Sequence, residues 1–245
     1  MSLEAQQAGA LLRVQDLVKR FGGFTALAGV SFHLQPGEVL GLVGPNGSGK
    51  TTCINVISGL YAPDGGTVRY EGRSIGGEKP HALAKAGINR TFQSPRPFLS
   101  LTVRENVELA AHYGDPREGF DVDALLAELE LDQYADRPAA ELNSAQQKTL
   151  DLARALATEP KLLLVDELAA GLNPSELNRM ADRLRALADG GMALLVVEHL
   201  MGFIDKVTDR VVIMAAGKEF FGGTLADATK DPDVIRVFLG GGHHG

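Results

Sequence analysis

The sequence has a single cysteine, no excess of positive charge and no long apolar run. With only Cys53 present, disulfide frameworks and sites built from several cysteines are excluded, and a reducing compartment is expected. The 24 basic and 31 acidic residues give a net charge of −7, which argues against nucleic-acid binding, because such binding depends on positive charge. No apolar run approaches the ~18 residues of a membrane-spanning helix, and no signal-peptide pattern opens the sequence. We therefore expect a soluble, cytoplasmic protein.

Short apolar runs alternate with helical patterns along much of the chain. Runs with the length of buried strands stand at residues 39–43, 162–165, 193–197 and 211–214. Helical patterns follow three of them, at residues 50–60, 174–188 and 199–207. Pro174 suits a first helical turn, and Asn173 suits the cap before it. This alternation predicts an α/β fold with a mainly parallel sheet.

Two regions depart from the alternation. Residues 103–157 carry helical patterns and no clear strand pattern, which predicts a helical insert within the α/β core. The N-terminal third has shorter, more polar candidate strands, at residues 12–18, 30–34 and 67–70. Glycine and proline separate these strands, so we expect an N-terminal antiparallel β layer beside the parallel sheet.

The strongest motif is a glycine-rich loop with the sequence GPNGSGKT at residues 44–51. It fits the phosphate-binding pattern G-x-x-x-x-G-K-[ST] and lies between an apolar run and a helical pattern, as that pattern requires. The glycines let backbone N–H groups curl around phosphates, and the following helix adds the positive end of its dipole. Lys50 is expected to reach the terminal phosphates, and the Thr51 hydroxyl to hold Mg²⁺.

Two further apolar runs end in polar residues. The run KLLLVDE places Asp166 and Glu167 at the end of a predicted strand, where doubly wound sheets bind ligands. Asp166 suits a Mg²⁺ partner, and Glu167 suits a general base that activates water. The run ALLVVEH ends in His199, which could contact the γ-phosphate or position water, or could simply cap the strand–helix junction.

These pieces, in this order, resemble the ATP-binding cassette of ABC transporters from about Leu12 to Leu239. The resemblance implies a single P-loop ATPase domain over 1–245, with its core at about 1–92 and 158–245 and a helical subdomain at about 93–157. It identifies Gln93 as the glutamine that senses Mg²⁺ and contacts the membrane partner. The nucleotide-binding residues it implies are Phe21, which would stack on adenine, with Gly44, Asn46, Gly47, Ser48, Gly49, Lys50, Thr51 and Thr52. Glu167, His199 and Lys50 would be catalytic, and Thr51, Gln93 and Asp166 would hold Mg²⁺.

The segment LNSAQQK at residues 142–148 falls where the family has its signature Leu-Ser-x-Gly-Gln. That signature presents N–H groups to ATP held by the other subunit of a dimer, which assigns Asn143, Ser144, Ala145 and Gln146 to the partner's nucleotide. Here Asn143 replaces the serine and Ala145 replaces the glycine. Either Asn143 or Ser144 could cap the helix, and Ser144 with Gln147 has capping-box spacing. The Ala145 methyl group stands where glycine permits close approach to a phosphate.

Three stretches resemble the ATPase subunits of branched-chain (hydrophobic) amino acid importers: residues 166–174, residues 93–106 and the C-terminal DPDVIRVFL at 231–239. The implied function is ATP hydrolysis that energises import at the cytoplasmic face of the inner membrane. The implied partners are transmembrane permease subunits, a second ATPase subunit across the loop at 170–173 and, indirectly, an extracytoplasmic solute-binding protein. A homodimer would carry two altered sites, and a heterodimer with a signature-intact partner one altered and one intact site. The resemblance favours the heterodimer, because importers of this subfamily often pair two different ATPase subunits.

Four alternatives remain open. The chain could serve an importer of urea or another small solute, since this subunit never touches the solute. It could be a clamp that hydrolyses ATP weakly, because of Asn143 and Ala145. A soluble ABC protein of translation or DNA repair would need two cassettes or a long insertion, and a small-molecule kinase should lack the 142–148 element.

Overall fold

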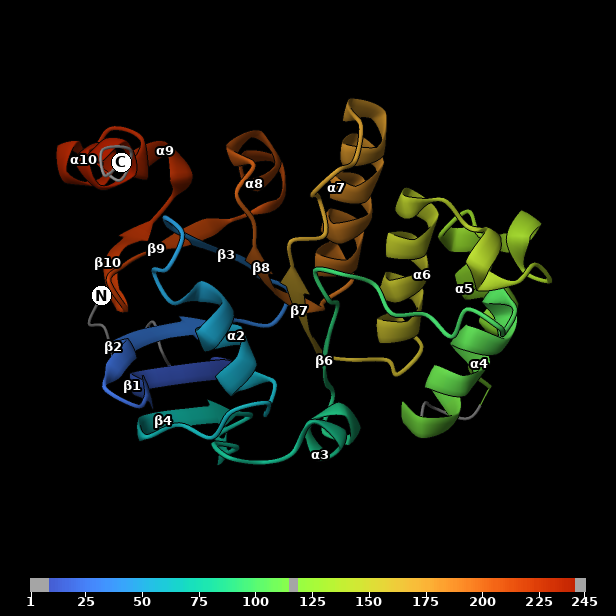
Figure 1. The fold of residues 1–245 in the computed structure, drawn as a ribbon, viewed down its shortest axis with the longest axis horizontal. Helices are drawn as coiled ribbons and strands as arrows, with labels where there is room; N and C mark the ends of the chain where they lie inside the picture. Colours follow the sequence, from blue (N-terminus) through green and yellow to red (C-terminus); the bar gives the residue numbers. More distant parts are fainter. Residues whose placement is uncertain (1–8, 115–118, 241–245) are drawn as a thin grey trace.

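The computed structural model describes residues 9–114 and 119–240. Two β-sheets with their helices form the core, and a separate group of helices stands beside them (Figure 1). Among the described residues, no helix is both long and apolar enough to cross a membrane.

The smaller sheet is antiparallel and comes from the N-terminal third of the chain. Its strands have the order β2-β1-β4-β5. They are β1 (Leu12–Phe21), β2 (Phe24–Leu34), β4 (Gly65–Tyr70) and β5 (Arg73–Ser74). In the middle strand, Leu12 faces Leu34 of β2 on one side and Tyr70 of β4 on the other. The predicted antiparallel layer is therefore confirmed, with longer strands than the polar pattern indicated.

The larger sheet has the order β10-β9-β3-β8-β7-β6. Its strands are β3 (Val39–Val43), β6 (Ile88–Arg90), β7 (Leu162–Asp166), β8 (Ala193–Val197), β9 (Arg210–Ala215) and β10 (Lys218–Gly223). All neighbours are parallel except β9 and β10. The predicted mainly parallel sheet is confirmed, while β6 and β10 at its two edges were not predicted.

Alternate residues of the central strands face two different hydrophobic clusters. In β7, Leu163 and Val165 pack into the cluster that holds the helices of the insert, whereas Leu162 and Leu164 pack toward α2 and the small sheet. Because both faces are covered, every residue of β3, β7 and β8 is buried. This explains why these strands are continuous apolar runs in the sequence.

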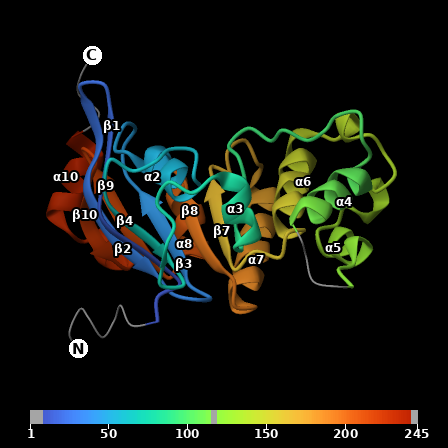
Figure 2. The same cartoon turned by 90° about the horizontal axis from the view of Figure 1, so that it is seen from below.

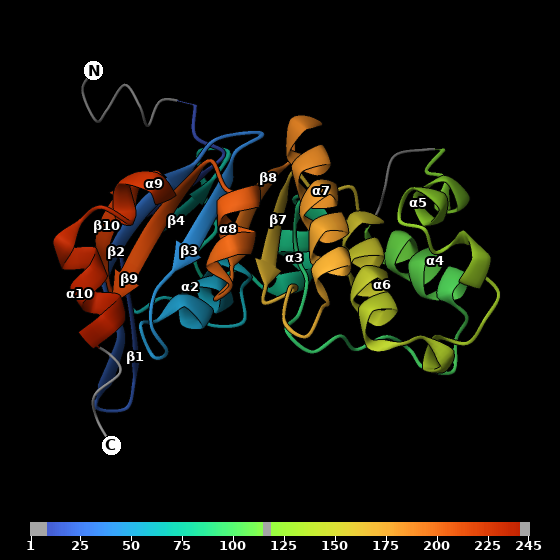
Figure 3. The ribbon, with the colours of Figure 1, turned by 90° about the horizontal axis from the view of Figure 1, so that it is seen from above.

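The core helices cover both faces of this sheet (Figures 2 and 3). They are α2 (Lys50–Ile57), α3 (Pro80–Lys85), α7 (Pro174–Asp189), α8 (Met201–Val207), α9 (Leu225–Ala228) and α10 (Pro232–Gly240). The predicted cap of α7 is confirmed, since the Asn173 side chain accepts hydrogen bonds from the main-chain N–H groups of Ser175 and Glu176. The predicted helix at 50–60 ends earlier, at Ile57, and the one at 199–207 begins later, at Met201.

The predicted helical insert is present. It comprises α4 (Val103–Gly114), α5 (Val122–Glu128), the short 3-10 turns η1 (Asp132–Tyr134) and η2 (Ala139–Glu141), and α6 (Ser144–Leu156). No strand element lies between residues 103 and 157 in the described part of the chain. Apolar side chains of α4, α5 and α6 join the same buried cluster as those of α7 and β7. The insert is thus packed against the sheet at the side that carries β7 (Figure 1).

Candidate functional site

The glycine-rich loop joins the end of β3 to the start of α2. Gly44 and Gly49 have φ angles of 151° and 105°, a region that L side chains rarely adopt. A Cβ atom on Gly44 would lie 2.2 Å from the Met214 carbonyl oxygen, and one on Gly49 would lie 2.7 Å from that of Ala26. Neither position can carry a side chain, so backbone conformation and space both require these two glycines.

Lys50 opens α2 and is buried beneath the loop. Its Nζ donates hydrogen bonds to the carbonyl oxygens of Gly44, at 2.8 Å, and Pro45, at 3.0 Å. Burial lowers the pKa of Lys50, and the carboxylates of Glu167 and Asp166 oppose that shift. The ammonium group is therefore held in the loop itself, facing the acidic pair. Of the other expected nucleotide-binding residues, Ser48 is buried, Thr52 is half-buried, and Asn46, Gly47 and Thr51 are exposed.

Asp166 ends β7 and is buried in an ion pair that no local sequence pattern predicts. Its Oδ2 accepts a hydrogen bond from Arg90 Nη2 at 2.9 Å. Arg90 belongs to β6 and also donates to Asn55 and Ser58 at the end of α2. Burial raises the pKa of Asp166, and the adjacent guanidinium opposes the shift. The only sequence signal for Arg90 is a charged residue three positions before Gln93.

The chemistry of the expected metal ligands fits Mg²⁺. Thr51, Gln93 and Asp166 supply a hydroxyl, an amide and one carboxylate, which are hard oxygen donors. Among the described residues, no group of three or more His, Cys, Asp and Glu side chains could hold a metal ion. Mg²⁺ in nucleotide sites needs no such group, because it takes one or two carboxylates together with waters and substrate phosphates.

Glu167, Gln93 and His199 meet at one point, although they lie far apart in the sequence. His199 Nε2 is 2.8 Å from Glu167 Oε1, and Gln93 Nε2 donates a hydrogen bond to Glu167 Oε2. The Glu167 side chain is largely buried, and its backbone has a φ of 50°. This left-handed conformation is uncommon for a non-glycine residue. The structure thus brings the expected base, its histidine and the expected metal-sensing amide together.

Phe21 ends β1 with its ring partly exposed. The ring packs edge-on against Tyr61, with centroids 5.1 Å apart, and Lys19 Nζ lies 5.5 Å from its centroid. The exposed part of the ring is compatible with stacking on a base. Tyr61 and Lys19 were not predicted, because nothing in the sequence connects residues 61 and 21.

The signature-like segment begins α6 with an intact helix cap. Asn143 Oδ1 accepts a hydrogen bond from the main-chain N–H of Gln146 at 2.9 Å, and Gln146 Oε1 accepts one from that of Asn143 at 2.9 Å. The cap is therefore Asn143, and the predicted box of Ser144 with Gln147 was wrong. Gln147 donates instead to the Leu142 carbonyl oxygen. An amide at position 143 reaches the third residue of the helix, which leaves Ser144 uninvolved.

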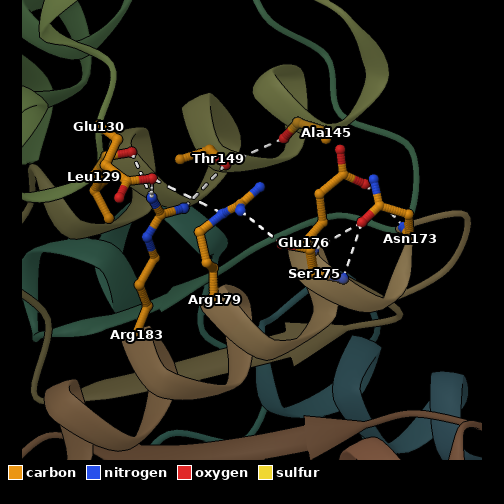
Figure 4. Close-up of polar contacts among 9 residues, drawn as sticks. All are labelled: Leu129, Glu130, Ala145, Thr149, Asn173, Ser175, Glu176, Arg179 and Arg183. Atoms are coloured by element: carbon orange, nitrogen blue, oxygen red, sulfur yellow. Dashed lines mark hydrogen bonds and ion pairs between the residues drawn. The ribbon is translucent and has the colours of Figure 1, made fainter.

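A cavity of about 420 Å³ lies between the first turns of α6 and the helix α7. Arg183 of α7 lines the cavity and donates hydrogen bonds to the Leu129 carbonyl oxygen, at 2.9 Å, and to the Glu130 carboxylate, at 2.8 Å (Figure 4). Asn143, Ala145 and Gln146 also line it. The signature-like residues are not gathered with the phosphate loop, because β7 stands between α2 and α6 (Figures 1 and 3). Within one chain they form a separate surface.

The protein-family model for the ABC transporter family matches residues 27–170 of the chain. The chain is 35% identical over 249 residues to the high-affinity branched-chain amino acid transport ATP-binding protein BraF of Pseudomonas aeruginosa, covering 94% of this chain and 98% of that protein. It is 38% identical over 245 residues to the probable branched-chain amino acid transport ATP-binding protein LivG of Archaeoglobus fulgidus, covering 94% and 95%.

Solved structures show the same fold. The ADP conformation of MJ1267, an ATP-binding cassette of an ABC transporter, superposes with a TM-score of 0.84 at 32% identity and covers 94% of this chain and 99% of that one. The dimeric post-hydrolysis state of the cassette MJ0796 with ADP and Pi has a TM-score of 0.77 at 25% identity, covering 87% and 98%.

Proposed function

Since the chain belongs to the ABC transporter family, as an ATP-binding subunit with ATPase activity, we propose that it energises the import of branched-chain or other hydrophobic amino acids. The observation that carries the substrate class is the identity of 35% and 38%, over 94% of this chain, to two branched-chain amino acid transport ATP-binding proteins. The proposed place of action is the cytoplasmic face of the membrane, beneath separate permease subunits that receive solute from a binding protein.

The proposed reaction uses the residues gathered at the ends of β3, β7 and β8. The glycine-rich loop binds the phosphates, with Lys50 at their terminal groups and Phe21 against the base. Thr51, Asp166 and Gln93 would hold Mg²⁺, which neutralises phosphate charge when bound. Glu167 takes a proton from the attacking water, and His199 holds the carboxylate through Oε1, at 2.8 Å in this structure. The core and the helical subdomain, at about 93–157, act as one cassette.

We propose that ATP is enclosed between two cassettes. The loop at 170–173 and the start of α6 would form the face that meets the second subunit. The separation of α6 from the phosphate loop within one chain supports this arrangement (Figure 1). A homodimer would carry two sites with Asn143 and Ala145, and a heterodimer only one. We therefore favour a heterodimer with a second subunit whose signature is intact, because it would keep one unaltered site.

Replacing Ala145 by glycine, alone or with Asn143→Ser, is expected to raise the ATPase rate. Removal of the methyl group lets the N–H approach a phosphate, and one recovered hydrogen bond of ~0.5–1.5 kcal/mol corresponds to an increase of about two- to tenfold. Steady-state phosphate release measures it. Ala127→Gly, at an exposed position of α5, is the matched control for the loss of helix propensity. An unchanged rate in both signature variants would make the two departures neutral.

A groove beside Gln93 is the proposed docking surface for a cytoplasmic helix of the permease. It is a cavity of about 460 Å³ between α3, β6 and the helices α4 and α6. Phe92 and Tyr113 line it with 44% and 72% of their surfaces exposed. Phe98 and Leu99, exposed in the segment that leads from Gln93 to α4, add apolar surface. A contiguous exposed apolar patch on a protein surface marks a contact site for other proteins.

The groove predicts a selective loss of partner binding. Tyr113→Asp is expected to abolish co-purification of the permease with the tagged chain from membranes, while the isolated chain keeps its ATPase rate, because Tyr113 lies outside the nucleotide site. Phe24→Asp, at another exposed aromatic ring, is the matched control. Retention of the permease by Tyr113→Asp would reject the groove as the docking surface.

The substrate class is tested by transport. Cells that lack this chain are expected to lose uptake of labelled leucine and to regain it on complementation. Loss of urea uptake with normal leucine uptake would instead favour the small-solute importer. An isolated chain with full activity and no membrane partner would contradict the transport function.

A further inference from the structure

Two buried charges lie on either side of the segment that follows β7. Lys148 of α6 is 7% exposed, and Glu198, directly after β8, is 2% exposed. Neither has a role in the reaction outlined above. The segment between them runs from Glu167 to Ala170 and connects the proposed base to the loop at 170–173.

Lys148 places its ammonium group on the main chain of this segment. Nζ donates to the carbonyl oxygens of Ala170, at 2.5 Å, Leu168, at 2.9 Å, and Glu167, at 3.4 Å. An ammonium group has three donors, so all of them have acceptors in one short stretch of backbone. Lys148 also lies on the helix that begins with the signature-like residues. Lys148 thereby links α6, the helix that begins with the signature-like residues, directly to the backbone segment that carries Glu167.

Glu198 holds the same segment from the sheet. Its Oε1 accepts a hydrogen bond from the main-chain N–H of Ala169 at 2.6 Å. Burial raises the pKa of Glu198 and lowers that of Lys148, and the two opposite charges oppose each other's shifts. Both groups reach the backbone of the segment, one from the helical insert and one from the core.

We propose that Lys148 and Glu198 are positioning residues that fix the catalytic carboxylate of Glu167 relative to the signature helix. Glu167 has a backbone φ of 50°, which is uncommon for a non-glycine residue. Lys148 holds the carbonyl oxygens of Glu167, Leu168 and Ala170 through hydrogen bonds. We call Lys148 and Glu198 together the Lys148–Glu198 clamp. Through it, the start of α6, which would meet the partner's nucleotide, and Glu167, which would act on the chain's own nucleotide, are held by the same two residues.

This inference rests on the role proposed for Glu167, and it separates turnover from nucleotide binding. Lys148→Met is expected to lower kcat by about 10- to 100-fold, because small displacements of a catalytic group have effects of that size. The Kd for ATP in the presence of EDTA, measured by calorimetry, should stay within about twofold, since the Lys148 hydrogen bonds go to residues 167, 168 and 170 and not to the phosphate loop. Lys148→Arg, which keeps the charge and the donors, should recover most of the rate.

Two further variants keep the test decisive. Lys161→Met removes an exposed lysine paired with Glu71 and is the control for the loss of one positive charge. Glu198→Gln retains an oxygen for the Ala169 N–H but removes the charge near Lys148, and it should lower kcat by at least about threefold. It replaces Lys148→Met as the test if the latter does not show a cooperative melting transition.

The inference is overturned if folded Lys148→Met keeps kcat within about twofold of the wild type, or if kcat and ATP affinity fall together. It is also overturned if Lys148→Arg is as slow as Lys148→Met. Glu167→Gln in the same assay distinguishes a failure of the proposed base from a failure of the positioning role of Lys148 and Glu198. Full turnover by Glu167→Gln rejects the proposed base, whereas a slow Glu167→Gln with a fast Lys148→Met rejects only the clamp.

Discussion

Replacing Glu167 by glutamine is expected to lower ATP turnover by about 10²–10⁴-fold, which is the usual contribution of a general base. The amide cannot take a proton from water, although it has nearly the shape of the carboxylate. It can still accept a hydrogen bond through its oxygen, so the contact with either Gln93 or His199 can persist. The chemistry should be lost with little change in the fold.

Because binding of ATP does not depend on the base, Glu167→Gln should accumulate in an ATP-bound, closed dimer. Single-turnover phosphate release measures the rate, and size-exclusion chromatography with ATP measures the dimer. Glu108→Gln, which removes an exposed carboxylate on α4, is the matched control. Turnover equal to that of the wild type would exclude Glu167 as the base.

Replacing Lys50 by alanine is expected to reduce the affinity for ATP by about 10- to 100-fold or more. Hydrogen bonds to charged groups contribute ~1.5–3 kcal/mol each, and a lysine in this loop faces more than one phosphate oxygen. The change also removes the donors that reach the carbonyl oxygens of Gly44 and Pro45. The loop would then lose its internal support as well as its charge, and the ATPase rate should fall with binding.

Calorimetric titration with ATP measures this affinity directly. Lys85→Ala, in the last turn of α3, removes an exposed lysine outside the loop and should bind ATP as the wild type does. Unchanged affinity of Lys50→Ala would remove the assignment of residues 44–51 as the nucleotide site, and with it the proposed reaction.

The parts of the fold that the sequence predicted have strong local patterns. The runs at 39–43 and 193–197 coincide with β3 and β8, since strands buried on both faces must be apolar throughout. The edge strands were missed for the opposite reason. β6 has only three residues and ends in Arg90, and β10 is mostly exposed. Neither carries enough apolar residues to be recognised without its neighbour.

The residues of the candidate site also fall into those that a local sequence pattern predicted and those that only the fold brings together. The glycine-rich loop and the acidic pair are contiguous in sequence, so their spacing alone indicated their chemistry. The pairing of Arg90 with Asp166 joins residues from two different strands, and no local pattern predicts it. The same holds for Lys148, whose spacing on α6 gives no sign that it reaches residues 19 to 22 positions further along the chain.

The sequence by itself determined the α/β fold, the phosphate loop, the acid pair and the family, because each depends on short-range order of residue types. Only the tertiary structure decided which polar groups meet. Parallel strands bring their carboxyl ends to one edge of the sheet, so residues as distant as Gln93, Glu167 and His199 gather there. It also decided the helix cap at Asn143 and the buried clamp of Lys148 and Glu198. The proposed link between α6 and Glu167 depends on Lys148 reaching the backbone of the segment that follows β7, and no contiguous motif indicates that contact.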